Sequence, residues 1–215
     1  MKAYVAIIDY GMGNLFSIAK ACQYVGLDAV VTSRKEEIDE ACGIILPGVG
    51  AFGDAMENLR KLGLIQPLKA ALDASKPFLG ICLGMQLLMS ESTEFGIHKG
   101  LDAIKGTVVR FPVLDPGNNR IKIPHVGWSR ICFDGAASSR AAIFKNTENG
   151  AYMYFAHSYF VNPDSSLDMQ VTTDYCGIRY CSGFVHRNIH AFQFHPEKSG
   201  LGGIELYRNF KEIVL

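Results

Sequence analysis

Neither sign of charge is in excess in this sequence. The 215 residues include 21 Lys and Arg against 21 Asp and Glu, so the formal net charge at pH 7 is zero. A protein that binds nucleic acid through its phosphates, or that lies on an anionic membrane, usually carries an excess of basic residues. The balance therefore argues against both classes of partner. Hydrophobic residues make up 48%, too many for a disordered chain, and the length suits a single domain over residues 1–215.

A long hydrophobic run is also missing. The longest stretch, residues 77–89, includes Gln86 and is shorter than the ~20 residues that cross a bilayer. The apolar residues near the N-terminus are followed at once by Asp9, without the small-residue cleavage site of a signal peptide. We therefore expect a first strand here, no membrane segment, and a cytoplasmic protein.

Cysteine spacing gives no sign of a metal site. No two C-x-x-C pairs occur, and in a cytoplasm the thiols are expected to be reduced. The sequence therefore predicts neither a metal centre nor a disulfide framework. The six cysteines are Cys22, Cys42, Cys82, Cys132, Cys176 and Cys181.

The first ninety residues alternate short apolar runs with longer helical patterns. Strands are expected at 4–8, 29–31, 43–46 and 78–81, and helices from residue 15 to about 25 and over 53–61, 65–74 and 84–90. This alternation predicts an α/β protein with a mostly parallel open sheet flanked by helices on both faces, a flavodoxin-like arrangement. The second half reads as strands at 106–113, 121–133, 152–156, 168–173 and 181–186, which add antiparallel strands to the same sheet, followed by a last strand at 189–194 and a helix over about 201–213.

The sharpest local motif is G-I-C-L-G at residues 80–84, between a predicted strand and a predicted helix. Hydrolases place a nucleophilic serine in such a turn, where the glycines permit a strained elbow that lifts the nucleophile above the sheet. Backbone N–H groups of the following helix favour a thiolate there. Cys82 is thus a candidate nucleophile, although a buried structural cysteine in a glycine-rich strand end is an equally simple interpretation.

A second motif, Q-F-H-P-E at residues 193–197, follows the last predicted strand. A catalytic thiol needs a proton carrier, and that carrier needs an orienting group. His195 and Glu197 can fill these two roles, since a strand end is where sites of α/β proteins are found. An isolated His-Pro-Glu turn on the surface is the simpler alternative.

A third motif, P-G-V-G-A-F-G at residues 47–53, also follows a predicted strand. Its glycines allow backbone N–H groups to face a substrate oxygen, and with the N–H of Leu83 they can form an oxyanion hole. It is not a phosphate-binding Walker loop, because no Gly-Lys-Ser/Thr follows. A flexible loop without a ligand is the alternative.

Taken together and in this order, the three motifs resemble the class I glutamine amidotransferases of the Cys-His-Glu triad type. The likeness extends from residue 9 to residue 210. Within the family, the chain is most similar to the glutaminase subunits that feed a cyclase in histidine biosynthesis. That similarity rests on D-Y-G-M-G-N at 9–14, Met85 beside Gln86, I-P-H-V-G-W at 123–128, H-S-Y at 157–159 and K-S-G at 198–200. Ser129 departs from the subfamily, which usually has Asn after the Trp.

The resemblance implies a role for each matching residue. Cys82 is expected to attack the side-chain amide of glutamine, with His195 as proton carrier and Glu197 as its orienting group. The backbone N–H groups of Val49 and Leu83 are expected to hold the oxyanion, and no metal or organic cofactor is implied. The residues expected to contact L-glutamine are Gly50, Gln86, Ser158 and Tyr159.

The resemblance also implies a partner, because the chain is too short to contain a synthase domain as well. The expected partner is a (β/α)8-barrel cyclase subunit, which receives ammonia through a tunnel and forms a heterodimer with this chain. The positions that match the partner-facing surface are Asn14, Trp128, Tyr154 and Lys198. Trp128 as a core aromatic and Lys198 as a solvated charge are the simpler interpretations.

Three other functions compete with this one. Paralogous subunits with the same triad feed ammonia to an N-acetyl sugar amidotransferase in surface-polysaccharide biosynthesis, and Ser129 favours them slightly. A flavodoxin-like binding protein fits the sheet but leaves Cys82, His195 and Glu197 without a role. A cysteine peptidase or hydrolase fits the triad but does not need Gln86 or Trp128.

Overall fold

The structure is a computed structural model that describes residues 3–133, 141–164, 167 and 169–215. Its helices are α1 (Leu15–Tyr24), α2 (Lys35–Glu40), α3 (Phe52–Lys61), α4 (Ile65–Asp73), α5 (Leu83–Leu87) and α6 (Gly200–Val214), with short 3-10 turns η2 (Ala142–Phe144) and η3 (Pro196–Lys198). Its strands are β1 (Val5–Ile8), β2 (Ala29–Thr32), β3 (Gly43–Leu46), β4 (Phe78–Ile81), β5 (Met89–Ser92), β6 (His98–Lys99), β7 (Ile104–Arg110), β8 (His125–Arg130), β9 (Cys132–Phe133), β10 (Tyr152–His157), β11 (Tyr159–Pro163), β12 (Met169–Tyr175), β13 (Ile178–His186) and β14 (Ile189–Phe192).

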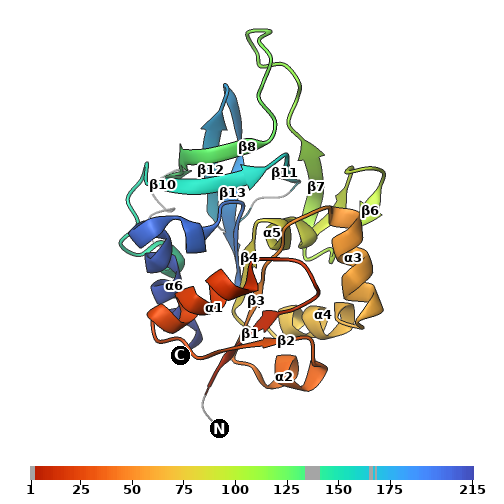
Figure 1. Ribbon diagram of the computed structural model, residues 1–215, viewed down its shortest axis with the longest axis vertical. Coiled ribbons are helices and arrows are strands. Elements are labelled where there is room, and N and C mark those ends of the chain that lie inside the picture. The colour runs from red at the N-terminus through yellow and green to blue at the C-terminus, as the bar shows by residue number, and fades with distance from the viewer. Residues whose placement is uncertain (1–2, 134–140, 165–166, 168) are drawn as a thin grey trace.

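One large mixed sheet organises the fold (Figure 1). Its order is β2-β1-β3-β4-β14-β13-β11-β7-β5-β6, with β12 paired to β13 and β9 paired to β12. Strands β2, β1, β3, β4 and β14 run parallel, whereas β13 and β11 are joined to their neighbours in antiparallel fashion; β7 is antiparallel to β11 and parallel to β5. The predicted fold class is therefore confirmed.

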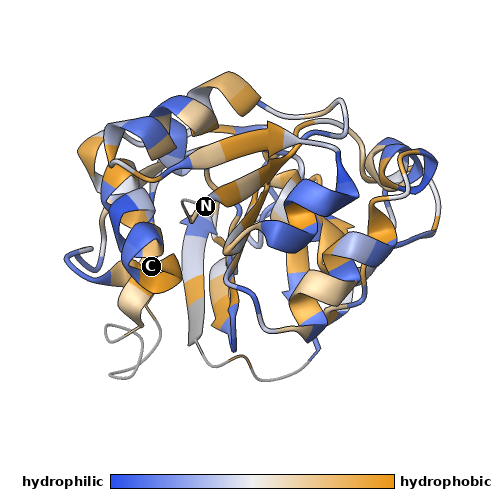
Figure 2. Cartoon of the chain, turned by 90° about the horizontal axis from the view of Figure 1, so that it is seen from below, coloured by the Kyte–Doolittle hydropathy of each residue, from blue (hydrophilic) through white to orange (hydrophobic). Residues whose placement is uncertain are grey.

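The parallel strands are buried on both faces. In β1, Ala6 and Ile8 belong to the core that α2, α3 and α4 cover, whereas Val5 and Ile7 belong to the opposite core beneath α1 and α6. Alternate residues of a strand point to opposite faces, so a continuous apolar run serves both cores. Figure 2 shows these apolar strands at the centre and hydrophilic stretches on the outer helices.

One expectation about the second half is wrong. Strands β8 and β10 pair only with each other among the described residues and form a separate two-stranded sheet. On the inner face of β8, His125 is buried and Gly127 and Ser129 are half-buried, whereas Val126 and Trp128 point outward. Such alternation identifies a strand but not the strand it pairs with, so the sequence did not distinguish the two sheets.

Several element boundaries also differ from the prediction. The expected helix at 84–90 ends at Leu87, and Met89 instead begins β5, which pairs with β7. A short apolar run fits a helix or a strand equally well, and here pairing with β7 decides. Residues 121–124 of an expected strand lie outside β8, and the short elements α2 and β11 were not expected. Residue 168, the expected start of another strand, lies outside the described residues.

Candidate active site

The three motifs meet because β3, β4 and β14 are neighbours in the sheet and run parallel. The carboxyl ends of parallel strands lie on one edge, which is where α/β proteins bind ligands. Strand β4 ends immediately before Cys82, β3 ends immediately before Pro47, and β14 ends three residues before His195. The sheet therefore brings together segments that are far apart in the sequence.

Cys82 occupies a strained elbow between β4 and α5. Its φ of 53° lies in the left-handed region, which residues with a side chain seldom adopt. Gly84 lets α5 pass very close to β3, because a Cβ at this position would lie 1.8 Å from the carbonyl oxygen of Leu46. The thiol is 5% exposed and borders a cavity. The predicted elbow is present.

His195 and Glu197 form a buried pair at the end of β14. Nδ1 of His195 donates to Oε1 of Glu197 at 2.8 Å, and the two side chains are only 4% and 1% exposed. Burial alone lowers the pKa of His195, but its hydrogen bonds to Cys82 and Glu197, together with their negative charges, raise that pKa to about 10. The imidazole thus links the thiol to the carboxylate, as the triad requires.

Two buried amides extend this arrangement. Gln193 is fully buried, and its Nε2 donates to Sγ of Cys82 at 3.6 Å. Gln86 donates through its own Nε2 to Oε1 of Gln193 at 3.1 Å and to the carbonyl oxygen of Tyr159 at 2.9 Å. Gln193 had no expected role of its own, although it lies in the Q-F-H-P-E motif. The period of two along a strand, which puts it on the same side as His195, could have identified it.

The loop expected to form the oxyanion hole, residues 47–53, is not oriented to form it in this structure. The N–H of Leu83 donates to the carbonyl oxygen of Gly48 at 3.3 Å. The Gly48–Val49 peptide is trans, so its N–H points opposite to its C=O and away from Leu83. The two donors named for the oxyanion, Val49 and Leu83, are therefore not directed at one point in this structure.

A cavity of about 270 Å³ opens beside the thiol. It is lined by all four residues expected to contact glutamine, namely Gly50, Gln86, Ser158 and Tyr159, and by Val49, Cys82 and Leu83. Glu94, from the loop after β5, is the only Asp, Glu, Lys or Arg among its lining residues, and Oε2 of Glu94 accepts a hydrogen bond from the N–H of Phe52 at 2.7 Å. No sequence motif pointed to Glu94.

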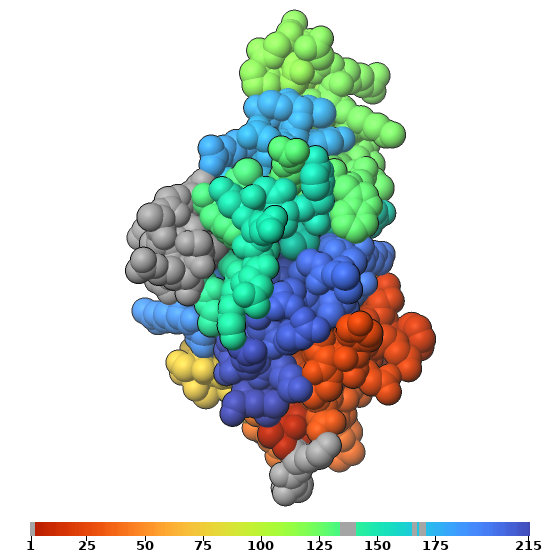
Figure 3. All heavy atoms as spheres, turned by 90° about the vertical axis from the view of Figure 1, so that its left-hand side faces the viewer, coloured from red at the N-terminus to blue at the C-terminus, as the bar shows by residue number. Residues whose placement is uncertain are grey.

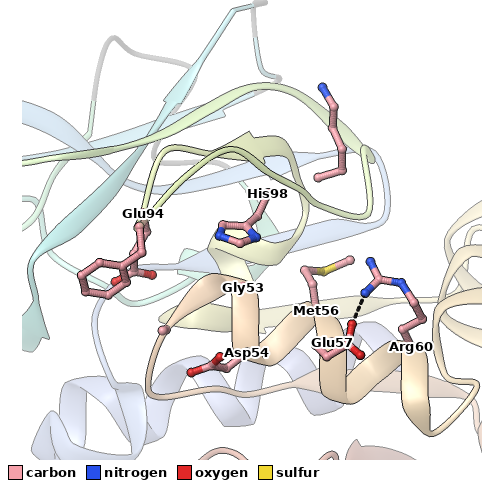
Figure 4. Close-up of a pocket in the computed structure, with 10 residues that line it drawn as sticks. Gly53, Asp54, Met56, Glu57, Arg60, Glu94 and His98 are labelled. Carbon is pink, nitrogen blue, oxygen red and sulfur yellow. Dashed lines mark hydrogen bonds and ion pairs between the residues drawn. The ribbon is translucent and has the colours of Figure 1, made fainter.

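A larger cavity of about 480 Å³ lies on the other side of Glu94, between α3 and the β5–β6 hairpin (Figure 4). In the close-up, Glu94 and His98 face Gly53 and Asp54 at the start of α3, while Glu57 pairs with Arg60. No cysteine, serine or threonine lines this cavity. Size alone favours it as a site, but Cys82 lines the smaller cavity, and His195 is hydrogen-bonded to Cys82.

Two neutral histidines lie at the cavity beside Cys82: His157 lines it, and the ring of His125 packs against His157. Burial lowers the pKa of His125 to about 4 and that of His157 to about 3. Nδ1 of His157 lies 2.8 Å from the carbonyl oxygen of Tyr159, which can only accept, so Nε2 is the acceptor for the hydroxyl of Tyr180 at 3.2 Å. Tyr180 also contacts Nδ1 of His125, whose Nε2 lies 2.8 Å from Oγ of Ser129. Ser129 is thus the outer end of a buried network.

The residues expected to face a partner lie on one side of the molecule. Trp128 is 54% exposed and meets the ring of Tyr154 edge to face at 6.0 Å, and Nζ of Lys198 lies 5.9 Å from that ring. Asn14 caps α1 by accepting from the N–H of Ser17 at 3.3 Å. Figure 3 shows that face, where β10 lies above α6 and beside them is α1. Trp128 is therefore not a core aromatic.

The rest of the described chain offers no competing centre. Among those residues, no group of three His, Cys, Asp or Glu side chains is placed to hold a metal ion. No described helix combines the length and apolarity needed to cross a membrane. All six cysteines are free thiols.

Comparison with known proteins adds independent findings. The family described as glutamine amidotransferase class-I matches residues 6–213. Imidazole glycerol phosphate synthase subunit HisH of Geobacter sulfurreducens is 44% identical over 210 residues, 97% of this chain and 98% of that protein. The protein of the same name from Methanothermobacter thermautotrophicus is 46% identical over 211 residues, 98% of each chain.

Solved structures agree at the level of the fold. A protein from Thermoplasma acidophilum, described as a putative GMP synthase component, superposes with a TM-score of 0.70 at 21% identity, covering 100% of this chain and 94% of that chain. PurLQS from Thermotoga maritima gives a TM-score of 0.71 at 16% identity, with both chains fully covered. At such low identity these two likenesses show the shared fold alone.

Proposed function

Because this chain belongs to the class-I glutamine amidotransferase family, we propose that it is a glutaminase subunit that supplies ammonia for imidazole glycerol phosphate formation in histidine biosynthesis. The observation that carries the proposal is that Cys82, which lines a cavity of about 270 Å³, is hydrogen-bonded to His195, which in turn is bonded to Glu197. Relatives that match nearly the whole chain are named as subunits of the synthase for that product. We infer a single cytoplasmic domain over residues 1–215.

The reaction follows from the charges and hydrogen bonds of the site. The thiolate of Cys82 attacks the carbonyl carbon of the glutamine side chain, and a tetrahedral oxyanion forms. His195, protonated because its pKa is raised to about 10, gives its proton to the departing amine, so ammonia leaves and a γ-glutamyl thioester remains. Water, deprotonated by the now neutral His195, then attacks the thioester and releases glutamate. Glu197 holds Nδ1 throughout and stabilises the imidazolium.

Substrate binding is assigned to the cavity residues. We assign the α-ammonium group of glutamine to Glu94, because it carries the only fully charged group in the lining, and the amide end to Cys82. Gly50, Gln86, Ser158 and Tyr159 complete the pocket. None of these steps calls for a metal or an organic cofactor, since side chains supply the nucleophile and both proton transfers.

The oxyanion loop provides the means of control. While the N–H of Leu83 donates to the carbonyl oxygen of Gly48, neither it nor the N–H of Val49 can donate to the developing oxyanion. Turning over the Gly48–Val49 peptide frees Leu83 and directs the N–H of Val49 into the site. One such donor is worth ~3–4 kcal/mol in comparable enzymes. A (β/α)8-barrel cyclase subunit that binds over Asn14, Trp128, Tyr154 and Lys198 would favour the second state through its differential affinity.

This function is tested by tracing the side-chain amide nitrogen of glutamine into the product. Glutamine labelled with heavy nitrogen in its side-chain amide is given to this chain together with a candidate cyclase and its acceptor substrate. The proposal predicts heavy nitrogen in the imidazole product, and no incorporation with Cys82→Ala. Incorporation only when an N-acetyl sugar amidotransferase replaces the cyclase would overturn the histidine assignment and leave the glutaminase assignment intact.

A further inference from the structure

Glu197 has a buried oxygen that the triad leaves without a partner. Its Oε1 accepts from His195, but its Oε2 is enclosed by protein and has no hydrogen-bond partner among the residues that the structure describes. A buried carboxylate oxygen without a donor is costly, and the cost rises when the group must remain ionised. A donor for Oε2 is therefore missing from the triad as described so far.

Tyr207, on α6, has a buried hydroxyl group that could donate the missing hydrogen bond. The side chain is fully buried, and within the described part of the chain its hydroxyl also has no hydrogen-bond partner. A phenol donates one hydrogen bond and accepts others, so it can satisfy the carboxylate in a way that a second acceptor cannot. Two buried polar groups that each lack a partner are natural candidates for each other.

The packing of α6 places Tyr207 next to the segment that carries Glu197. At Gly203 the helix touches η3: a Cβ there would lie 2.0 Å from the carbonyl oxygen of Pro196 and 2.7 Å from Cβ of Ser199. Tyr207 lies one turn after Gly203, on the same face of the helix. Side chains on a helix point back toward its N-terminus, so Tyr207 extends over this contact toward η3.

The electrostatics agree with this placement. Burial raises the pKa of the Tyr207 phenol well above its usual value, and the charge of Glu197 raises it further. The titratable groups around the pair are Cys22 from α1, and His195 and Cys82 on the far side of Glu197. Tyr207 therefore remains protonated and able to donate across the working pH range.

From these contacts we propose that Tyr207 is a positioning residue: its hydroxyl donates to Oε2 of Glu197 and holds the carboxylate against His195. A small side-chain shift or one bridging solvent molecule completes the bond. The proposal rests on the proposed function and adds a fourth member to the Cys82, His195 and Glu197 chain. Its effect is to keep Glu197 ionised and fixed, so that His195 stays protonated and aimed at the thiol.

The first test is Tyr207→Phe in the full complex with the cyclase and its acceptor substrate. The variant keeps the ring and its packing and removes only the hydroxyl. We expect kcat for glutamine to fall about tenfold with little change in KM, the loss expected for one hydrogen bond to a charged group. Product formation from added ammonium salts should be unchanged. Tyr4→Phe, which removes a hydroxyl bonded to the carbonyl oxygen of Glu37, is the matched control.

A second measurement does not depend on activity. An NMR titration of the His195 imidazole should show a lower pKa in Tyr207→Phe than in the wild type, because a less firmly held carboxylate stabilises the imidazolium less. In a Glu197→Gln background, Tyr207→Phe should cause no further shift, since Tyr207 acts through Glu197. If the wild type does not hydrolyse glutamine but the His195 pKa shifts as expected, the glutaminase function is refuted and the role of Tyr207 stands. An unchanged His195 pKa, or a Tyr207→Phe protein that is more stable and equally active, would overturn the role of Tyr207.

Discussion

The backbone N–H of His195 donates to the carbonyl oxygen of Tyr154 at 2.9 Å. Ser199 bridges the same two backbone segments, since its Oγ donates to the carbonyl oxygen of His195 at 2.7 Å and accepts from the N–H of Tyr154 at 3.0 Å. The ring of Tyr154 meets the exposed Trp128 on the outer face. A protein that binds this face therefore contacts a strand that is fixed directly to the proposed proton carrier.

This connection predicts that Ser199→Ala weakens activation by the partner. The change leaves the N–H of Tyr154 without its acceptor, which costs about 1–3 kcal/mol of folding stability. We expect a lower melting temperature, a reduced kcat in the complex and a nearly unchanged KM. Ser90→Ala, which removes an exposed hydroxyl bonded to Asp102, is the control and should change none of these. A variant that is destabilised but fully activated would show that Ser199 is merely structural.

Cys82 should be the thiol that reacts with a glutamine analogue. Diazo-oxo-norleucine enters the cavity as glutamine does, so mass spectrometry should find its adduct on Cys82. Burial raises the pKa of Cys22 to about 12, which keeps that thiol inert. Cys176 is exposed and serves as an internal control, because iodoacetamide should label it while the analogue should not. An analogue adduct mainly on Cys176 or Cys22 would refute the nucleophile assignment.

The pairing of His195 with Glu197 predicts how the rate of glutamine hydrolysis depends on pH. His195 must carry a proton to release ammonia, and its raised pKa of about 10 keeps that proton through neutral pH. The rate should therefore fall only as pH approaches about 10. In Glu197→Gln one of the causes of the raised pKa is gone, so the fall should begin at lower pH, whereas His195→Ala should abolish steady turnover. An alkaline limb that does not move in Glu197→Gln would contradict the role of Glu197.

Glu94 should govern affinity for glutamine and not the chemical step. Replacing it by Gln keeps an acceptor for the N–H of Phe52 but removes the charge opposite the α-ammonium group. We expect KM to rise about tenfold or more, the loss of a charge-assisted hydrogen bond, with a smaller change in kcat. Glu91→Gln, on the preceding strand β5 and paired with exposed Lys99, is the control. Equal KM values for the two variants would exclude Glu94 from the substrate site.

Much of this site could be predicted from the sequence because its motifs follow short apolar strands. The carboxyl ends of parallel strands share one edge, so the elbow of Cys82 and the pair of His195 and Glu197 had to be near each other once β4 and β14 were neighbours. The motifs and the class of sheet therefore predicted a shared edge, and the pairing of β14 with β4 put the two motifs side by side on it.

Other parts depended on tertiary contacts. Glu94 reaches the cavity only because Met89 begins a strand that pairs with β7, where the local apolar pattern fitted a helix as well. The partners of Tyr207 depend on how closely α6 approaches η3 at Gly203. The direction of the Gly48 carbonyl is a property of one peptide plane, and glycine permits either orientation.

The most direct test is the rate of glutamine hydrolysis by this chain alone, with the cyclase, and with the cyclase plus its acceptor substrate. Because the N–H of Leu83 is engaged by Gly48, we predict that the isolated chain is slower than the full complex by about a hundredfold or more, the effect of an absent oxyanion donor. Cys82→Ala should be inactive in all three mixtures. If the isolated chain hydrolyses glutamine as fast as the full complex, the proposed control by the partner is wrong.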